Sequence, residues 1–381
     1  MATNKNITMK QFNGVDYDTL YPKTIASQID DVYSKSETLS NSTQSIMGLG
    51  NDATPDDAFL ALFIGAGTYG YRVKIQLADG TPVEGSTVSG INAFTGSTLV
   101  SGADGFVFGK STSKTVTISC TSPYIDQAAP ASQSVTATGT ITDVTLTLTS
   151  ITDMITVTSS KTTKVSPMAK TMDVTAVGGG GGGGGYNQNS RYDGAGAGGG
   201  GGYVSTKIGV ECADKLLKIT IGGRGWGSNY ADGNVSAGGN GGDTSLQIDG
   251  VSALTANGGK GGAGGSSGPT AGGSGNGSGG NGGRYSDVAQ PGGSGSGYIF
   301  NDSNLGRAGG GGGGGGFSGN NATDATAKSG GLPYGGKGGT QEGTYSGTSG
   351  IGPGGGGGGA GGSNGNGGAG GSGQMYLRFH F

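Results

Sequence analysis

The middle of the chain alternates hydrophobic and polar positions. Between residues 70 and 150, several stretches carry apolar residues at every second position, as at Val73, Ile75 and Leu77 and at Val144, Leu146 and Leu148, and Asp-Gly pairs occur between such stretches at Asp79-Gly80 and Asp104-Gly105. Period-two alternation predicts β-strands, and frequent turn dipeptides are typical of a small β-sandwich. The sequence therefore predicts a β-sandwich domain over residues 69–150.

The first 68 residues follow a different pattern. Apolar residues over 25–32 fall at helical spacing, and Thr54-Pro55 opens a second helical segment that ends at Gly65. Two short helices that are apolar on one side suit docking to a partner or to another copy of this chain. A hairpin packed on the next domain is the alternative. We expect residues 1–68 to be an attachment segment.

The last part of the chain, residues 151–381, carries unbroken glycine runs. A run without side chains has nothing to bury, so neither an amphipathic helix nor an ordinary strand is expected. Either the runs are flexible tethers, or they are extended left-handed rods with three residues per turn and about 3.1 Å of rise per residue. Several runs of similar length are what a bundle of rods needs and a tether does not. The runs span residues 178–185, 198–202, 309–316 and 354–359.

Alternating segments interrupt and close this glycine region, as over 203–210, 216–221 and 375–381. A flexible linker has no reason to carry such strands. Buried rods must exchange hydrogen bonds with one another, because buried backbone groups are rarely left unpaired, and only glycine allows backbones to approach from every side. We therefore expect a mainly β chain with short N-terminal helices, a β-sandwich, and a β-base that carries a bundle of glycine rods.

Composition narrows the functional classes. The chain has 381 residues, 93 of them glycine, and a net charge of −3. It offers no basic face to neutralise phosphates, so nucleic acid is not expected as a partner. High glycine content can indicate disorder, but 15 Tyr and 10 Phe are unusual in disordered segments. Collagen is excluded, because glycine does not recur strictly at every third position.

The sequence shows no targeting signal and no pattern of disulfide-forming cysteines. The apolar patch over 58–64 is too short to span a bilayer, and the chain does not open on a signal-peptide pattern. We therefore expect synthesis in a cytoplasm and no membrane insertion. Cys120 and Cys212 are isolated from each other in the sequence, so a disulfide framework is not expected.

The sequence offers no catalytic constellation. His380 is the only histidine, so no Ser-His-Asp or Cys-His arrangement can be built around other positions. Zinc-ligand and EF-hand spacings are absent, and we expect no cofactor, no metal and no enzymatic activity. Four loop aspartates can in principle pair for glycoside hydrolysis, although capping of turns is the simpler role. They are Asp193, Asp232, Asp243 and Asp324.

Binding is better supported, because aromatic residues recur between the runs. Tyr and Trp give large, rigid contact areas at a small cost in entropy. Some of these rings must cover the flanks of a bundle, while others are free to face a ligand. We assign eight aromatics to the ligand-facing set: Tyr192, Trp226, Tyr230, Tyr285, Tyr298, Phe300, Tyr334 and Tyr345.

Two stretches resemble known families. Pro82-Val83-Glu84-Gly85, followed by Ala103-Asp104-Gly105-Phe106, resembles prealbumin-like and carboxypeptidase regulatory-like modules, which are Ig-like spacers. A strand that ends at Val177, its glycine run, and a closing strand that ends Phe379-His380-Phe381 resemble the glycine-rich domain of bacteriophage tail fibre and tail-tip proteins. This second resemblance covers residues 151–381.

The phage resemblance implies a function. In such relatives the rods form a hexagonally packed polyglycine-II bundle, and loops at its distal end recognise the host. It implies that this chain is a receptor-binding protein, or adhesin, of the virion tail tip. Its partners would be a bacterial surface protein or glycan and, through residues 1–68, other tail or baseplate proteins, and mounting on a fibre suits a homotrimer.

Two other functions stay open. One is a structural tail-fibre or baseplate tip component without direct receptor binding, for which short polar loops are expected. The other is an ice- or surface-binding protein, which would need a regular Thr or Ala ladder. Aromatic loop residues and irregular runs favour the receptor-binding function over both.

Overall fold

The structure is a computed structural model of the chain. It describes residues 9–12, 17–20, 68–94, 98–130, 132–138, 141–150, 154–186, 195–229, 236–265, 271–282, 289–309, 329–331, 333–339, 345–361 and 365–381. The described residues are mainly β, in several small sheets, with only two short 3-10 turns. They divide into two compact units, Met1–Pro123 with Gln127–Ser150, and Tyr124–Asp126 with Ile151–Phe381.

The described N-terminal residues form strands. β1 (Met9–Phe12) and β2 (Tyr17–Leu20) pair antiparallel, with Met9 opposite Leu20. The helices that the sequence predicts over 25–32 and 54–64 lie outside the described residues.

The first unit contains two four-stranded sheets. One has the order β6-β3-β10-β8 and the other β5-β4-β7-β9, and β3 and β10 run parallel. Alternate residues of β3 are fully buried from Tyr71 to Leu77, which confirms the period-two pattern. Gly80 and Gly105 follow their aspartates with positive φ, as turns at these positions require. The strands are β3 (Tyr69–Leu77), β4 (Thr87–Ser89), β5 (Leu99–Val100), β6 (Phe106–Ser111), β7 (Thr115–Cys120), β8 (Gln127–Ala128), β9 (Gln133–Thr136) and β10 (Ile141–Ser150).

The second unit has a base of two further four-stranded sheets, with the orders β11-β20-β13-β14 and β12-β15-β16-β17. Their buried side chains, such as Met172, Leu217 and Leu377, form one hydrophobic cluster. A β-base in this part of the chain agrees with the alternating segments of the sequence. The strands are β11 (Met154–Val157), β12 (Lys161–Lys164), β13 (Thr171–Val177), β14 (Val204–Glu211), β15 (Leu216–Thr220), β16 (Thr244–Ile248), β17 (Val251–Ala256) and β20 (Gln374–His380).

A short insertion lies on the same base. β18 (Gly297–Tyr298) and β19 (Arg307–Ala308) pair antiparallel and enclose two 3-10 turns, η1 (Ile299–Asn301) and η2 (Ser303–Leu305). Ile299 and Phe300 pack with Val177 and Tyr376 in a second buried cluster.

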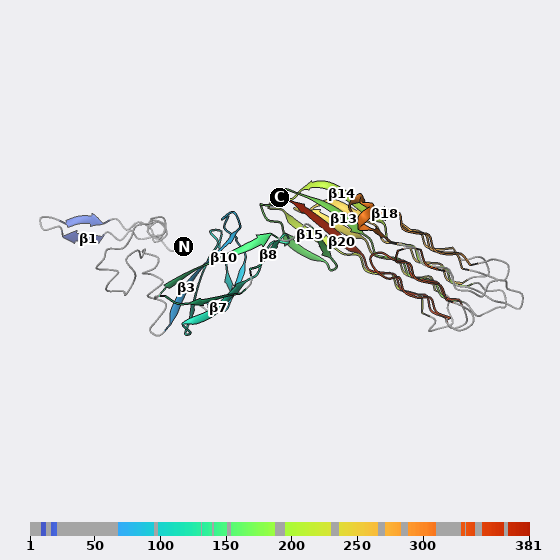
Figure 1. Cartoon of the computed structure of the whole chain (residues 1–381), viewed down its shortest axis with the longest axis horizontal. Coiled ribbons are helices and arrows are strands. Elements are labelled where there is room, and N and C mark those ends of the chain that lie inside the picture. Colours follow the sequence, from blue (N-terminus) through green and yellow to red (C-terminus); the bar gives the residue numbers. More distant parts are fainter. Residues whose placement is uncertain are drawn as a thin grey trace, which may run out of the picture. The chain divides into compact units, whose positions relative to one another are not determined.

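Six of the eight base strands join an extended run in the sequence, and Figure 1 shows these runs leaving the sheets side by side. The run 178–186 follows β13, the run 221–229 follows β15, and the run 257–265 follows β17. The runs 195–203, 236–243 and 365–373 lead back into β14, β16 and β20.

Residues 178–185, the central run, bond to their neighbours with a period of three. Gly178, Gly181 and Gly184 donate to the run 195–203, and Gly179, Gly182 and Gly185 donate to the run 236–243. Gly180 and Gly183 donate to the run 365–373, and the eight N–H···O distances are 2.8–3.2 Å. The central run also accepts hydrogen bonds from the runs 221–229, 257–265 and 354–361.

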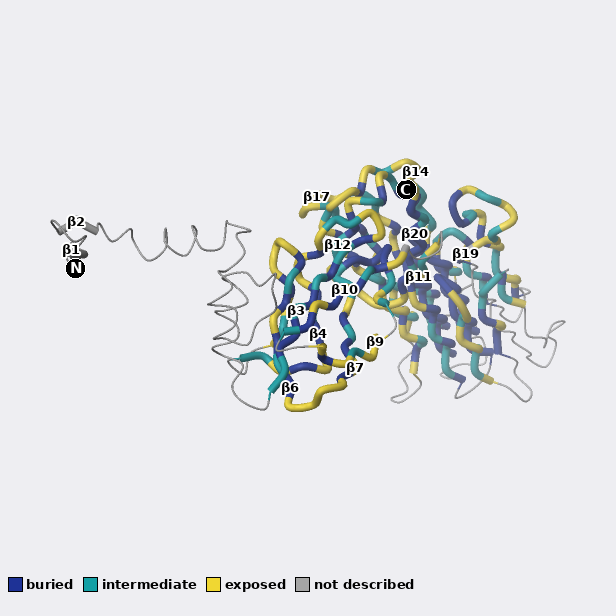
Figure 2. The backbone as a smooth tube through the Cα atoms, turned by 60° about the vertical axis from the view of Figure 1, so that its left-hand side comes forward, coloured by how far each residue is buried: buried dark blue, intermediate teal, exposed yellow. Residues whose placement is uncertain are grey.

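These six neighbours form a closed ring. Going round it, the order is 195–203, 354–361, 365–373, 221–229, 236–243 and 257–265, and each run bonds to the next and the last to the first. Examples are Gly199 N–H to the Gly357 carbonyl at 2.7 Å and Gly239 N–H to the Trp226 carbonyl at 2.7 Å. The central run is fully buried, as the dark interior in Figure 2 shows.

Candidate binding surface

The run 221–229 places two large side chains on the outside of the ring. Gly225 and Ser228 donate to the carbonyls of Gly180 and Gly183 at 2.8 and 3.0 Å, so this side of the run faces the central run. Gly222, Gly225 and Ser228 are buried, whereas Arg224 and Trp226 are exposed. With three residues per turn, positions between the inward ones must point elsewhere. We call positions of this kind outward positions.

Arg224 and Trp226 interact with each other. The Trp226 side chain is 70% exposed, and the guanidinium carbon of Arg224 lies 5.6 Å from the centre of its ring. This is within the distance at which a cation is attracted to the face of an aromatic ring. The pair presents an exposed aromatic ring with a positive charge beside it.

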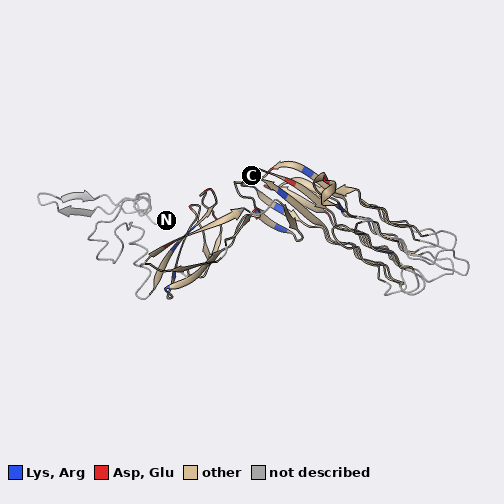
Figure 3. Cartoon of the chain, viewed as in Figure 1, with Lys and Arg blue, Asp and Glu red and all other residues tan. Residues whose placement is uncertain are grey.

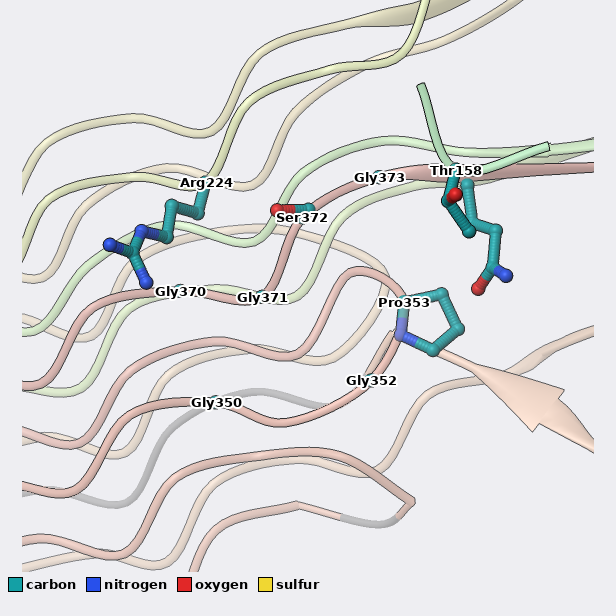
Figure 4. A pocket seen from close by; sticks show the side chains of 10 residues that line it. Thr158, Arg224, Gly350, Gly352, Pro353, Gly370, Gly371, Ser372 and Gly373 are labelled. Atoms are coloured by element: carbon teal, nitrogen blue, oxygen red, sulfur yellow. The ribbon is translucent and has the colours of Figure 1, made fainter.

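A hollow of about 420 Å³ adjoins Arg224. Figure 4 shows the Arg224 side chain extending along the run 365–373, with Gly352 and Pro353 across from it and Thr158 near Gly373. No Asp or Glu contributes to the lining among the described residues. The lining residues are Thr158, Arg224, Gly350, Gly352, Pro353, Gly370, Gly371, Ser372, Gly373 and Gln374.

The period of three also governs the other outer runs. Asn257 and Lys260 are exposed on one run, and Asn240 and Asp243 are exposed on the next. On a run outside the ring, Tyr345, Thr348 and Ile351 follow the same spacing, and Tyr345 and Ile351 are 43% and 67% exposed. Large side chains on these runs therefore lie outside the packed interior, whereas buried non-glycine positions such as Ala197, Ser228 and Ala360 carry small side chains.

Charge is scarce on this part of the molecule. Figure 3 shows Lys, Arg, Asp and Glu mainly on the strands and few along the runs. Within the base, Lys215 Nζ lies 2.9 Å from Asp249 Oδ2, and this hydrogen bond holds the pKa of the Asp249 carboxyl below its usual value. Arg224 has no ion pair among the described residues.

The structure separates the eight aromatics assigned from the sequence. Tyr192, Tyr230 and Tyr285 lie outside the described residues. Trp226 and Tyr345 are exposed. Tyr334 is half-buried, and its ring lies beside Gly352.

Tyr298 and Phe300 differ from the expectation of ligand-facing loop aromatics. Phe300 is only 6% exposed, its N–H donates to Thr175 Oγ1 at 2.8 Å, and Arg378 lies over its ring. Tyr298 is half-buried, and its hydroxyl accepts from Arg307 Nη2 at 2.7 Å. Phe300 anchors the β18–β19 insertion to the base, whereas the Tyr298 ring lies under the guanidinium of Arg307 in the same insertion.

Of the groups that the sequence raised as catalytic candidates, the two that the structure describes, His380 and Asp243, have structural partners. His380 Nε2 lies 3.0 Å from Asp173 Oδ2, and Asp173 Oδ1 accepts from the Gly209 N–H. Asp243 Oδ1 accepts from the Gly258 N–H at 2.8 Å, which ties two ring runs together. Asp193, Asp232 and Asp324 lie outside the described residues.

Neither a metal-ion cluster nor a membrane-spanning helix is found in the described part of the chain. No group of three or more His, Cys, Asp or Glu side chains is placed to hold a metal ion there. No helix in the same residues is long and apolar enough to cross a membrane.

Arg224 was not among the binding residues predicted from the sequence. A signal was present, because non-glycine residues recur at every third position in several glycine-rich segments, as in Asn257, Lys260 and Ala263. Such spacing distinguishes outward positions from packed ones.

Comparisons with known proteins add one family. The glycine-rich domain family matches residues 156–380. A search of curated proteins finds no match. Among solved structures, a Streptococcal ancillary pilin is 10% identical and aligns with a TM-score of 0.19 over 48% of this chain. The chain spans about half, 54%, of that pilin structure, and a likeness this weak supports no conclusion about fold or function.

Proposed function

The chain belongs to the glycine-rich domain family, and from that membership we propose that its runs are polyglycine-II helices that hold a recognition surface rigidly. A polyglycine-II helix has three residues per turn and no internal hydrogen bonds, so its N–H groups point to three neighbours in rotation. The period-three bonding of the central run and its closed ring of six neighbours support this assignment.

We further propose that the protein is a bacteriophage tail receptor-binding protein that recognises a molecule on the bacterial surface. The observation that carries this proposal is the ring itself, because its glycine backbones pack too closely for large side chains and leave aromatics such as Trp226 and Tyr345 exposed. Function in proteins is concentrated on loops and side chains that a rigid scaffold presents. The aromatic residues of segments 187–194, 230–235 and 283–288 belong to the proposed recognition surface.

The remaining parts of the chain complete the proposal. Residues 1–68 attach the protein to other tail or baseplate proteins, and residues 69–150 serve as an Ig-like or prealbumin-like spacer. Residues 151–381 are the adhesin domain. The protein acts at the virion tail tip, without catalysis, and a homotrimer suits mounting on a fibre.

Cell binding tests this function. The fluorescently labelled full-length chain is incubated with a panel of bacterial strains, beside a variant in which segments 187–194 and 230–235 are replaced by Gly-Ser of equal length. Receptor recognition is supported if the wild-type chain binds only some strains and the variant loses this binding while it keeps the wild-type melting temperature. Absence of binding to every strain, or binding that the replacement leaves intact, overturns it in favour of a structural tail component.

A further inference from the structure

We propose that the outward side of the run 221–229 is a binding surface for an anionic oligosaccharide, centred on Arg224 and Trp226. This inference does not rest on the proposed receptor function, because it uses neither the segments between the runs nor a phage context.

Packing of the bundle does not require these two side chains. Gly222, Gly225 and Ser228 make the inward contacts of this run, and a Cβ added at the neighbouring Gly223 would meet no atom within 4 Å. A tryptophan stabilises a fold by burying its ring, and one that is 70% exposed forgoes most of that gain. Outward positions on the next two runs carry asparagine, at Asn240 and Asn257, which the same backbone accommodates equally well.

The run also presents backbone donors beside Arg224. Within the described residues, the N–H groups of Arg224, Trp226 and Gly227 have no hydrogen-bond partner, in contrast to those of Gly225 and Ser228. With three residues per turn, the N–H groups of Arg224 and Gly227 point to the same side of the run, one turn apart, and each can donate to an oxygen of a ligand. The Arg224 guanidinium adds a planar fork that can bind a carboxylate or phosphate through two hydrogen bonds.

The adjoining hollow supplies room and polar groups. Its volume of about 420 Å³ lies in the ~300–1,000 Å³ range of small-molecule sites. Thr158, Ser372 and Gln374 line it with groups that can donate to or accept from hydroxyls, and Arg224 is its only charged lining residue among those described. A ligand that fits is therefore negatively charged and rich in hydroxyl groups.

Trp226 and the scaffold select a sugar within that class. A pyranose ring has a C–H face that packs on the apolar body of an indole, while its hydroxyls reach the neighbouring polar groups. Single-stranded nucleic acid also stacks on tryptophan, but its binding needs a groove with many positive charges. The run 221–229 carries a single positive charge, that of Arg224. The hydrogen-bonded runs hold the site in place before binding, which lowers the entropy lost on association.

The test uses the only tryptophan in the chain. Because Trp226 is that residue, intrinsic fluorescence of the full-length protein reports this surface directly. The probes are an oligogalacturonate for carboxylate, an oligomeric glycerol phosphate carrying sugar for phosphate, a neutral malto-oligosaccharide, and oligothymidylate. We expect a saturable change with one of the two anionic oligosaccharides, an affinity at least about 10-fold weaker for the neutral one, and weakening of anionic binding by salt.

Matched variants assign the effect to Arg224. Arg224→Gln should weaken binding of the anionic probe about 10-fold or more, since it removes charge-assisted hydrogen bonds to the anionic group. The affinity of Arg224→Lys for the anionic probe should lie between those of the wild type and Arg224→Gln, because lysine keeps the positive charge but lacks the planar fork of two donors. Lys260→Gln, a loss of charge at an outward position of another run, is the control and should leave the affinity unchanged. Trp226→Phe is followed by calorimetry and should weaken binding without changing the melting temperature.

Four results overturn the inference. They are no saturable response to either anionic oligosaccharide, equal affinity for the neutral one, no effect of Arg224→Gln, and tighter binding of oligothymidylate. The cell-binding experiment above is independent, because its variant changes segments 187–194 and 230–235 and leaves Arg224 and Trp226 in place. Either proposal can therefore fail while the other stands.

Discussion

At Gly182, packing leaves no space for a side chain. A Cβ added there would lie against the carbonyl group of Trp226, well inside the 3.0 Å that real Cβ atoms keep from other heavy atoms. That carbonyl already accepts from Gly239, so it cannot turn away without losing a bond. At Gly223, on the outer side of the neighbouring run, a Cβ would meet nothing within 4 Å.

We therefore expect Gly182→Ala to be strongly destabilising and Gly223→Ala to be neutral. Overpacking usually costs about 1–3 kcal/mol, and Gly182→Ala should reach at least about 3 kcal/mol because every obstructing atom is backbone. In a unit of this size, that loss lowers the melting temperature by about 10 °C. The Gly223→Ala variant should stay within about 0.5 kcal/mol of the wild type. Differential scanning calorimetry of the two proteins decides, and equal melting temperatures would contradict close backbone packing.

The two cysteines provide separate probes of the two units. Both are buried, and burial raises the pKa of the Cys120 thiol to about 11 and of the Cys212 thiol to about 12. The thiolate is the reactive species, so at pH 8 both side chains should react with a disulfide reagent far more slowly than in guanidinium chloride. Cys120→Ser and Cys212→Ser leave one reporter in each unit. Rapid labelling of the native protein would mean that the corresponding core opens readily.

Among the elements, the strands and the presence of a bundle could be predicted from the sequence, whereas the partners of each run could not. Alternation in β3 and in β20 is a local pattern, and a glycine run excludes other regular structures by its composition alone. The order of the ring depends on contacts between runs with nearly identical sequences, so no local signal distinguishes them. The burial of Phe300 was also hidden, because an aromatic residue between Ile299 and Asn301 looks like a loop residue until the base that it covers is known.

Deletions in the central run test whether its N–H groups face their neighbours with a period of three. Deleting Gly179 alone would rotate every later residue of the central run by about one third of a turn, so its N–H groups would face the wrong neighbours. Deleting residues 179–181 together would remove one whole turn, and each later N–H would again face its own neighbour. We expect the single deletion to lower the melting temperature of the second unit more than the triple deletion does. A larger effect of the triple deletion would exclude bonding with a period of three.

For the whole molecule, the closing step of the second unit lies at the C-terminus. β20 is paired on one side with β11 and on the other with β13, and the run 365–373 that precedes it is one of the six neighbours of the central run. β11 has β20 as its only strand partner among the described residues. Without β20 the sheet β11-β20-β13-β14 is divided, and the end of one ring run is left without its anchor.

We therefore expect a chain that ends at Gly373 to lose the second unit and keep the first. Each unit has its own buried residues, so the loss of one core does not remove the other. The reactivity of the two thiols reports the state of each unit, because Cys212 should become reactive at pH 8 while Cys120 stays protected.

Removal of Phe381 alone is the control, since this residue is 48% exposed and follows the last paired strand. If Cys212 stayed protected in the longer truncation, the ring and base would hold without β20, and bonds between runs would suffice to maintain the fold. If Cys120 also became reactive, the two units would depend on each other for stability.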